Sequence, residues 1–222
     1  TKIPKVSYFT TSNLKKIIET KPDLILGFSD IQKDIAKDLV ELGQDVWISN
    51  HRSISGIFRY IKTLSLMVDR KEEGEILLNR LEKQIIKAKA FSESLKEKPK
   101  VYFEEWDDPQ IVAIQWVSDV IERCGGVNIS KEKSLGLLAK ERFTNDKEVI
   151  KSNPDIIFAC HCGKKVKLES IYNRIGYSNI KAVINENIFE LEPEIFLQPG
   201  PAVIFDGIDI LIKHFEDWET QQ

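Results

Sequence analysis

The sequence of 222 residues lacks any run of about 18 apolar residues, so it encodes no membrane-spanning helix. Its first five residues lack the apolar stretch of a secretory signal peptide. With 32 Lys and Arg against 35 Asp and Glu, it also lacks the basic excess that is typical of nucleic-acid-binding proteins. We therefore expect no nucleic-acid partner, and either a cytoplasmic protein or one whose leader lies upstream of Thr1.

Cysteine is scarce as well, and the three present exclude a disulfide-stapled fold. Cys160 and Cys162 flank His161, but a structural zinc ion takes four ligands, and the chain offers only two further histidines, His51 and His214. The glycine-rich phosphate loops, the Gly-x-Ser-x-Gly nucleophile turn and the His-Glu-x-x-His zinc motif are absent. The sequence predicts no metal site and no catalytic residues, with a Cys/His enzyme as a remaining alternative.

Residues 13–28 and 145–160 repeat one pattern. Identical residues recur at equivalent places (13/145, 15/147, 18/150, 22/154, 23/155 and 25/157). In each copy an Asn, Asn13 or Asn145, can cap a short helix, and a Pro-Asp pair ends that helix. The apolar run that follows predicts a strand buried on both faces, as in a parallel sheet. Two copies 132 residues apart predict two lobes of similar design.

Between the copies, residues 53–96 carry apolar side chains at helical spacing, for example Ile54, Ile57 and Ile61. We expect one long helix that joins the two lobes. The charge run 69–73 and Gly74 are expected to mark a kink or a break in it. The alternative is one or two ordinary amphipathic helices.

Strands and helices alternate on both sides of this region. The predicted strands are residues 45–49, 100–105 and 188–191, and the predicted helices are residues 32–42, 117–124, 168–174 and 203–215. The fold class is therefore α/β, with two α/β lobes of mainly parallel sheets joined by one long α-helix. The predicted domains are residues 1–52 (a short N-terminal lobe), 53–98 (the linking helix) and 99–222 (the C-terminal lobe).

An acidic turn, residues 104–109, follows a predicted strand. Loops at the carboxyl ends of parallel strands are where α/β proteins bind ligands. Trp106 would supply a flat apolar wall there, and Trp116 shortly afterwards favours an aromatic-lined cleft. The alternative is a solvated turn with Trp106 packed on its own lobe. Cys160, after the second repeat strand, is expected to be packed, with His161 or Cys162 facing the cleft.

Taken in order, these segments resemble the substrate-binding proteins of ABC transporters for cobalamin, haem and ferric siderophores. The similar segments are residues 21–26 (Lys-Pro-Asp-Leu-Ile-Leu), 39–43 (Leu-Val-Glu-Leu-Gly), 120–129 and 148–157. Residues 105–109, 116–120 and 162–163 are most similar to the cobalamin-binding branch. The resemblance covers nearly the whole chain. It implies a bilobal fold with a long linking helix, a ligand held between the lobes, no enzymatic activity and no cofactor beyond that ligand.

The resemblance also implies that the ligand is a cobalamin-like metal chelate and that the protein is a monomer. It further implies a periplasmic or membrane-anchored location and an ABC permease as the partner. A corrinoid is wide and flat, so its site needs broad aromatic contact and few directed polar groups. The candidate ligand-binding residues are Tyr8, Phe9, Phe28, Trp106, Trp116, His161, Phe196 and Gln198. A site for an anionic siderophore is expected to contain arginines that face the ligand. Arg52 and Arg142 are the only evident candidates for such cleft residues, which favours a corrinoid. His161 is expected to make a hydrogen bond, and the alternative is contact with the metal of a haem or corrinoid.

Two departures from the family stand out. The strand–helix–strand segment with which the family begins is missing before Thr1. In the family, a surface glutamate on the helix before each Pro-Asp strand pairs with arginines of the permease. The matching positions hold Lys15 and Lys147, with Glu148 beside the second, and a shift of one residue turns a helix position by about 100°. These candidate docking residues argue against a standard permease and leave a cytoplasmic chelate-binding or sensing module as the alternative.

Overall fold

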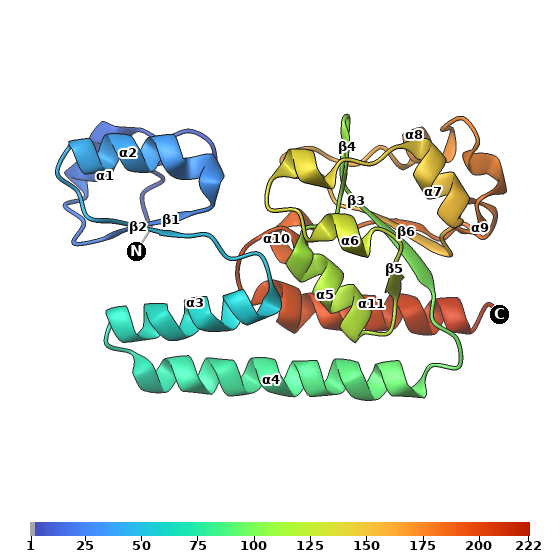
Figure 1. The fold of residues 1–222 in the computed structure, drawn as a ribbon. Helices are drawn as coiled ribbons and strands as arrows, with labels where there is room; N and C mark the ends of the chain where they lie inside the picture. The colour runs from blue at the N-terminus through green and yellow to red at the C-terminus, as the bar shows by residue number, and fades with distance from the viewer. Residues whose placement is uncertain (1–2) are drawn as a thin grey trace. The chain divides into compact units, whose positions relative to one another are not determined.

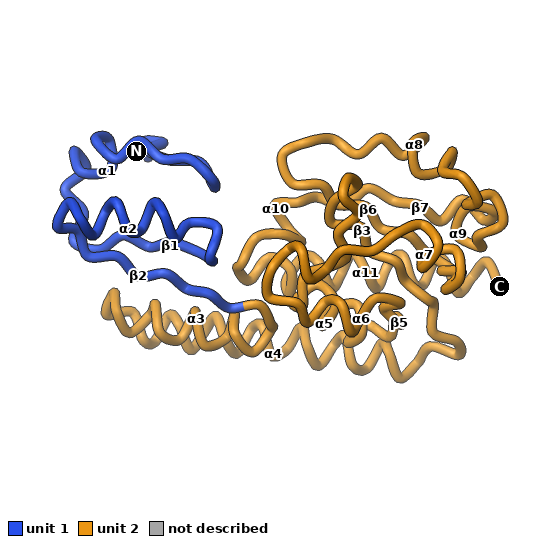
Figure 2. Tube along the Cα trace, turned by 45° about the horizontal axis from the view of Figure 1, so that its top comes forward, with its two compact units in different colours: residues 1–51 blue, residues 52–222 orange. Residues whose placement is uncertain are grey.

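The computed structural model describes residues 3–222, and the chain divides into two compact units, residues 1–51 and 52–222 (Figure 2). The helices after residue 52 belong to the second unit. The three-part division expected from the sequence, with a separate linking region, stays a prediction. Within residues 3–222, no helix combines the length and the apolar content that a membrane span requires.

The first unit is a two-stranded parallel sheet with two α-helices. Its elements are α1 (Leu14–Glu19), β1 (Ile25–Phe28), the 3-10 turn η1 (Asp30–Gln32), α2 (Lys33–Glu41) and β2 (Val46–Ser49). The two strands pair from Ile25 opposite Val46 to Phe28 opposite Ser49. Gly43, with a positive φ of 76°, follows the end of α2.

The internal repeat folds as two helix–turn–strand units. In the first copy Asn13 accepts a hydrogen bond from the backbone of Lys16 at the start of α1. In the second, Asn145 accepts one from the backbone of Glu148 at the start of α7 (Asp146–Ser152). The strands β1 and β6 (Ile156–Ala159) follow the two helices. The predicted caps and strands are therefore present in both copies. β6 is buried on both faces as expected, but β1 is not, because its Leu26 is 44% exposed.

The segment expected to be one long helix contains two. α3 (Ile54–Met67) and α4 (Lys71–Ser94) lie side by side and run in opposite directions (Figure 1). The chain reverses at Asp69, which has a positive φ of 53°, so the break falls at the start of the predicted charge run. Gly74 does not kink α4. A Cβ there would lie 2.3 Å from Ser65 Oγ, so glycine permits the close approach of the two helices. The long helix of the fold is α4, with 24 residues.

The second unit is built on a five-stranded, mainly parallel sheet. Its strands are β3 (Lys100–Asp107), β4 (Gln110–Val112), β5 (Val127–Asn128), β6 (Ile156–Ala159) and β7 (Ile188–Glu190). The order is β4-β3-β6-β7; β5 pairs with the beginning of β3, and β4 is antiparallel to the end of it. The hairpin of β3 and β4 replaces the simple turn expected after residue 105.

Helices cover both faces of this sheet. They are α5 (Gln115–Arg123), α6 (Lys131–Ser134), η2 (Ala139–Arg142), α7, α8 (Leu168–Tyr172), η3 (Tyr177–Asn179), α9 (Lys181–Ile184), α10 (Pro193–Phe196) and α11 (Ala202–Glu219). Phe103 and Phe158 face α10 and α11, where they contact Phe196 and Phe215. Side chains of the opposite face, such as Tyr102, pack with residues of α7, α8 and α9. Alternation along buried strands produces these two apolar layers.

Candidate functional site

Charged residues cluster at the carboxyl ends of β3 and β6, which lie side by side. The last residues of β3 are Glu104, Glu105, Trp106 and Asp107, and β6 leads into residues 160–167. This edge of a parallel sheet is the usual ligand-binding edge in α/β proteins. We therefore take it as the candidate site of the second unit.

Glu104 is completely buried and is held by three partners. Arg174 donates through both terminal nitrogens, with Nη2 at 2.9 Å from Oε1. His161 Nε2 lies 3.2 Å from Oε1, and the Tyr102 hydroxyl donates at 3.2 Å to Oε2. Burial by itself would raise the pKa of Glu104, but the hydrogen bonds from His161 and Arg174 outweigh it and lower that pKa. The carboxylate is thus kept ionised inside the unit.

Glu105 forms a second pair of the same kind. Arg142 donates to it through two nitrogens, at 2.5 and 2.9 Å, and also to the carbonyl of Val112 at 2.7 Å. The Arg142 side chain is only 5% exposed, so its charge is neutralised inside the protein. Arg52, the other predicted cleft arginine, is buried and donates to the carbonyl of Leu137 at 3.3 Å. Neither arginine therefore presents a free charge at the surface.

Trp106 is half-buried, and its ring is in contact with two side chains. The Lys164 ammonium lies 4.1 Å from the ring centroid, and the His161 ring centroid is 5.9 Å away. The indole nitrogen donates to the carbonyl of Asp108 at 3.1 Å. Lys164 also pairs with Asp107 at 2.5 Å. Sequence reasoning did not single out Lys164, although the Lys-Lys pair after Gly163, beyond a repeat strand, was a visible signal.

The Cys-His-Cys motif has no nucleophilic or metal-binding arrangement. Cys160 and His161 are buried, whereas Cys162 is exposed. Burial and the carboxylates of Glu105 and Glu194 raise the pKa of Cys162, so the thiol stays protonated at neutral pH. Among residues 3–222, no cluster of three or more His, Cys, Asp or Glu side chains could hold a metal ion. Either His161 or Cys162 was expected to face the cleft; His161 is 3% exposed and hydrogen-bonded to Glu104, whereas Cys162 is exposed.

Two other predicted ligand-binding residues are core residues. Trp116 is 1% exposed and donates from its indole nitrogen to the carbonyl of Phe196 at 2.8 Å. Phe196 is completely buried and contacts Phe103. The sequence placed Trp116 just before a helix, but it lies in the first turn of α5, where its side chain is buried and bonded to the end of α10. The expectation that Trp116 lines an aromatic cleft is therefore wrong, because its side chain is buried in the core.

The remaining predicted ligand-binding residues are accessible. In the first unit Tyr8 and Phe9 are 76% and 44% exposed, and Phe9 is close to Phe28, with ring centroids 6.5 Å apart. Phe28 is half-buried against His51, at 5.2 Å between centroids. In the second unit Gln198 is exposed between α10 and α11. Phe28 is the last residue of β1, and Tyr8 and Phe9 lie before α1.

The predicted docking lysines occupy equivalent places in the repeat. Each is the second residue of its helix, Lys15 in α1 and Lys147 in α7, and both are exposed. Lys15 forms only a long contact of 4.0 Å with Glu19, whose side chain is 61% exposed. Glu148 is not free, because it pairs with Lys133 and accepts from Thr144 at 2.8 Å.

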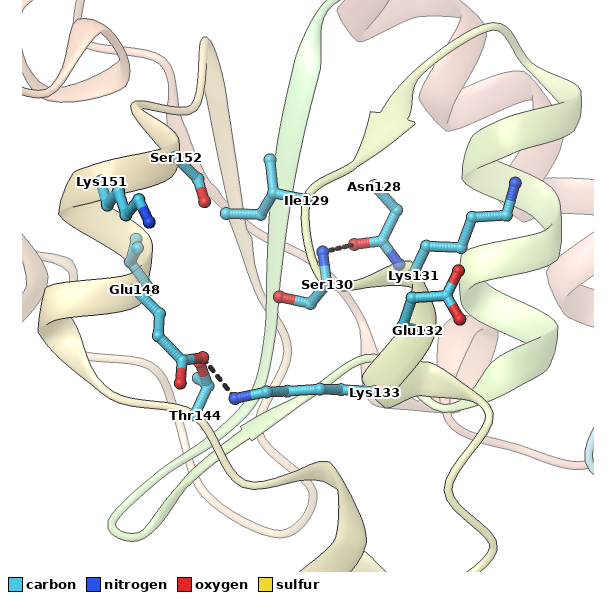
Figure 3. A pocket seen from close by; sticks show the side chains of 11 residues that line it. Asn128, Ile129, Ser130, Lys131, Glu132, Lys133, Thr144, Glu148, Lys151 and Ser152 are labelled. Carbon is cyan, nitrogen blue, oxygen red and sulfur yellow. Dashed lines mark hydrogen bonds and ion pairs between the residues drawn. The ribbon is translucent and has the colours of Figure 1, made fainter.

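A hollow of about 590 Å³ lies beside α7, between this helix and the segment after β5 (Figure 3). The ion pair of Lys133 and Glu148 crosses it, and hydroxyl groups of Ser130 and Ser152 point into it. None of the predicted ligand-binding residues lines this hollow. It thus adjoins the predicted docking helix rather than the candidate ligand site.

Known proteins with similar sequences are substrate-binding proteins. The chain is 24% identical over 207 residues to the ABC transporter substrate-binding lipoprotein YvrC of Bacillus subtilis, covering 90% of this chain and 64% of that protein. It is 27% identical over 231 residues to the vitamin B12-binding protein of Vibrio vulnificus, covering all of this chain and 79% of that one. The chain therefore spans about two thirds to four fifths of the length of these relatives.

Solved structures share the fold. The periplasmic haem-binding protein RhuT from Roseiflexus superposes with a TM-score of 0.81 at 20% identity, over 98% of this chain and 84% of that one. The vitamin B12-binding protein BtuF of Vibrio cholerae gives 0.71 at 21% identity, over 97% and 82%. These structures confirm the predicted α/β fold class. The family model described as "Periplasmic binding protein" matches residues 1–195. The chain therefore belongs to the periplasmic binding protein family, whose members bind substrates without enzymatic activity.

Proposed function

We propose that this protein captures a cobalamin-like corrinoid and delivers it for ABC-type import. The proposed ligand-contacting residues are the accessible aromatic residues Tyr8, Phe9, Phe28 and Trp106, with Gln198 as a polar contact. Relatives described as vitamin B12-binding proteins support this choice. Haem and ferric siderophores, which other relatives and neighbours of the fold bind, are the competing ligands of the same class.

The pairing of the arginines with glutamates is the observation that favours a corrinoid. A ligand with several carboxylates needs fixed cationic partners, and bidentate guanidinium groups serve this purpose best. Here Arg142 is committed to Glu105 and Arg174 to Glu104, each through two hydrogen bonds. Releasing Arg174 would leave the completely buried Glu104 without its cationic guanidinium partner, which is strongly unfavourable. The peripheral groups of cobalamin are mostly neutral amides, so its capture does not require a free guanidinium.

As a transporter component, the protein would act outside the cytoplasm as a monomer, with a permease as its partner. The relative named as a substrate-binding lipoprotein supports this location. The exposed lysines at the two docking positions favour a second candidate, a chelate-binding or sensing module that does not couple to a permease. The two candidates share the ligand and differ in the partner.

The test is a titration of the purified protein with cyanocobalamin, haemin and a ferric hydroxamate siderophore. We expect tryptophan fluorescence to be quenched by the corrinoid, with confirmation by calorimetry, and weaker binding of the other two ligands. Absence of corrinoid binding at about 50 μM, an affinity weaker than about −6 kcal/mol, would refute the proposed ligand. Tight binding of haemin or siderophore alone would keep the binding function and reassign the ligand.

A further inference from the structure

The ring of Trp106 is already covered by a charged side chain. The Lys164 ammonium lies 4.1 Å from the centre of the indole, within the range of a cation–π contact. Asp107 holds the same ammonium through an ion pair of 2.5 Å. The Trp106 indole nitrogen is fixed in turn by the carbonyl of Asp108, at 3.1 Å. Ring, cation and carboxylate thus form one arrangement at the end of β3.

The indole of Trp106 is half-buried, and Lys164 lies over its ring. The ring also packs against His161, which is 3% exposed and tied to the buried Glu104. The Lys164 side chain, in contrast, is 40% exposed. A ligand that stacks on this side of the indole must therefore displace the Lys164 ammonium.

We propose that Lys164 occupies the face of Trp106 on which the ligand stacks, so that the ligand must displace it and the Lys164–Asp107 pair sets the affinity of the site. This inference rests on the proposed function, since it assigns Trp106 to the ligand. It makes Lys164 a positioning residue that orders the indole in the empty protein and competes with the ligand for it.

The expected effect is modest, because the interactions that the ligand would displace are weak. An exposed cation–π interaction and an exposed ion pair each contribute little, and the displaced ammonium regains water. A neutral macrocycle that stacks on the indole offers no carboxylate to take the place of Asp107. Removing the ammonium should therefore tighten binding of a neutral corrinoid by about two- to tenfold.

The experiment compares Lys164→Met with the wild type in cyanocobalamin titrations. Lys165→Met is the matched control, because Lys165 is the adjacent exposed lysine and no ion pair involves it among residues 3–222. We expect tighter binding for Lys164→Met, no change for Lys165→Met, and no effect of Lys164→Met when Trp106→Ala is already present. Unchanged binding by Lys164→Met would overturn the proposal. Weaker binding would overturn it as well, because Lys164 would then contact the ligand rather than compete with it.

A measurement without ligand separates this inference from the proposed function. Acrylamide quenching of Trp106, obtained as the difference between each protein and its Trp106→Phe counterpart, should increase in Lys164→Met and stay unchanged in Lys165→Met. If quenching does not increase in Lys164→Met, the inference that Lys164 covers the indole ring is wrong. If quenching increases but no variant binds a corrinoid, the ring is covered as described, the proposed ligand fails, and the competition we propose fails with it.

Discussion

Glu104 and Arg174, 70 positions apart in the chain, form a two-bond ion pair in which the glutamate is completely buried. A buried pair of this kind stabilises little relative to apolar residues, but removing one partner leaves an uncompensated charge. We expect Arg174→Met to lower the free energy of unfolding by about 3 kcal/mol or more. Urea denaturation followed by circular dichroism measures this.

The control is Lys89→Met, which removes one partner of an exposed pair, with Glu93 at 3.7 Å. Exposed pairs of this type contribute about 0–1 kcal/mol. A loss for Arg174→Met as small as that for Lys89→Met would show that Glu104 is not held ionised in the core.

His214 makes the stability of the second unit depend on pH. It lies between Phe158 and Phe189, with ring centroids 5.2 and 4.2 Å away, and burial lowers its pKa below the ordinary value. The unfolded chain then binds a proton near pH 6.5 that the folded chain does not bind. Stability should therefore fall as the pH drops below about 6.5, until the lowered pKa of the folded state is reached.

The replacement His214→Leu should remove part of this fall. Urea midpoints at about pH 8 and pH 5.5 would be compared for both proteins, so that carboxylates, which titrate equally in the two, cancel. An identical fall in wild type and variant would contradict a lowered pKa at His214.

Gly74 should not tolerate a larger residue. In an unconstrained helix, alanine would stabilise relative to glycine by about 0.5–1 kcal/mol. Here a new Cβ would lie 2.3 Å from Ser65 Oγ in α3. We expect Gly74→Ala to destabilise by about 1–3 kcal/mol and Ser65→Gly to reduce that cost in the double variant. A stabilising Gly74→Ala in thermal denaturation would contradict the close approach of α3 and α4.

Trp106 and Trp116 should respond differently to truncation. Trp106→Ala is expected to weaken corrinoid binding by about 1–3 kcal/mol with little change in stability. Trp116→Ala removes a buried side chain and should cost about 3–5 kcal/mol of stability. Calorimetric titration and urea denaturation of both variants distinguish the two roles. Loss of binding in a stably folded Trp116→Ala would show that our assignment of Trp116 to the core is incomplete.

The lysines at the two docking positions should oppose a permease that carries basic docking patches. Like charges at an interface slow association, most strongly at low salt. We expect weak or no stimulation of a standard cobalamin permease in vesicles, measured as ATP hydrolysis, and a gain for Lys15→Glu combined with Lys147→Glu. Lys33→Glu with Lys165→Glu makes the same change of charge at exposed lysines outside α1 and α7. If the wild type strongly stimulates ATP hydrolysis and the Lys15→Glu, Lys147→Glu variant stimulates it less, the two lysines bind acidic residues of the permease.

Local sequence determined the elements and, through them, the family. The caps Asn13 and Asn145 and the apolar runs of β1 and β6 act within a few residues, so the repeat could be predicted and is present. The apolar periodicity of residues 53–96 also correctly predicted helical structure, because each turn of a helix depends on residues near one another in the chain. The same periodicity carries no information on where a helix reverses, and a single positive φ at Asp69 makes two helices out of one pattern.

Only the tertiary structure decided which charges and aromatic rings are available. Glu104 and Glu105 are adjacent in the sequence, but their arginines come from distant segments, at positions 174 and 142. Trp106 and Trp116 are alike as residues, yet one stays half-exposed beneath Lys164 and the other is buried in α5. Burial and ion pairing depend on interactions between residues far apart in the chain. The sequence therefore determined the candidate edge of the sheet and the family, while packing determined which side chains are exposed there.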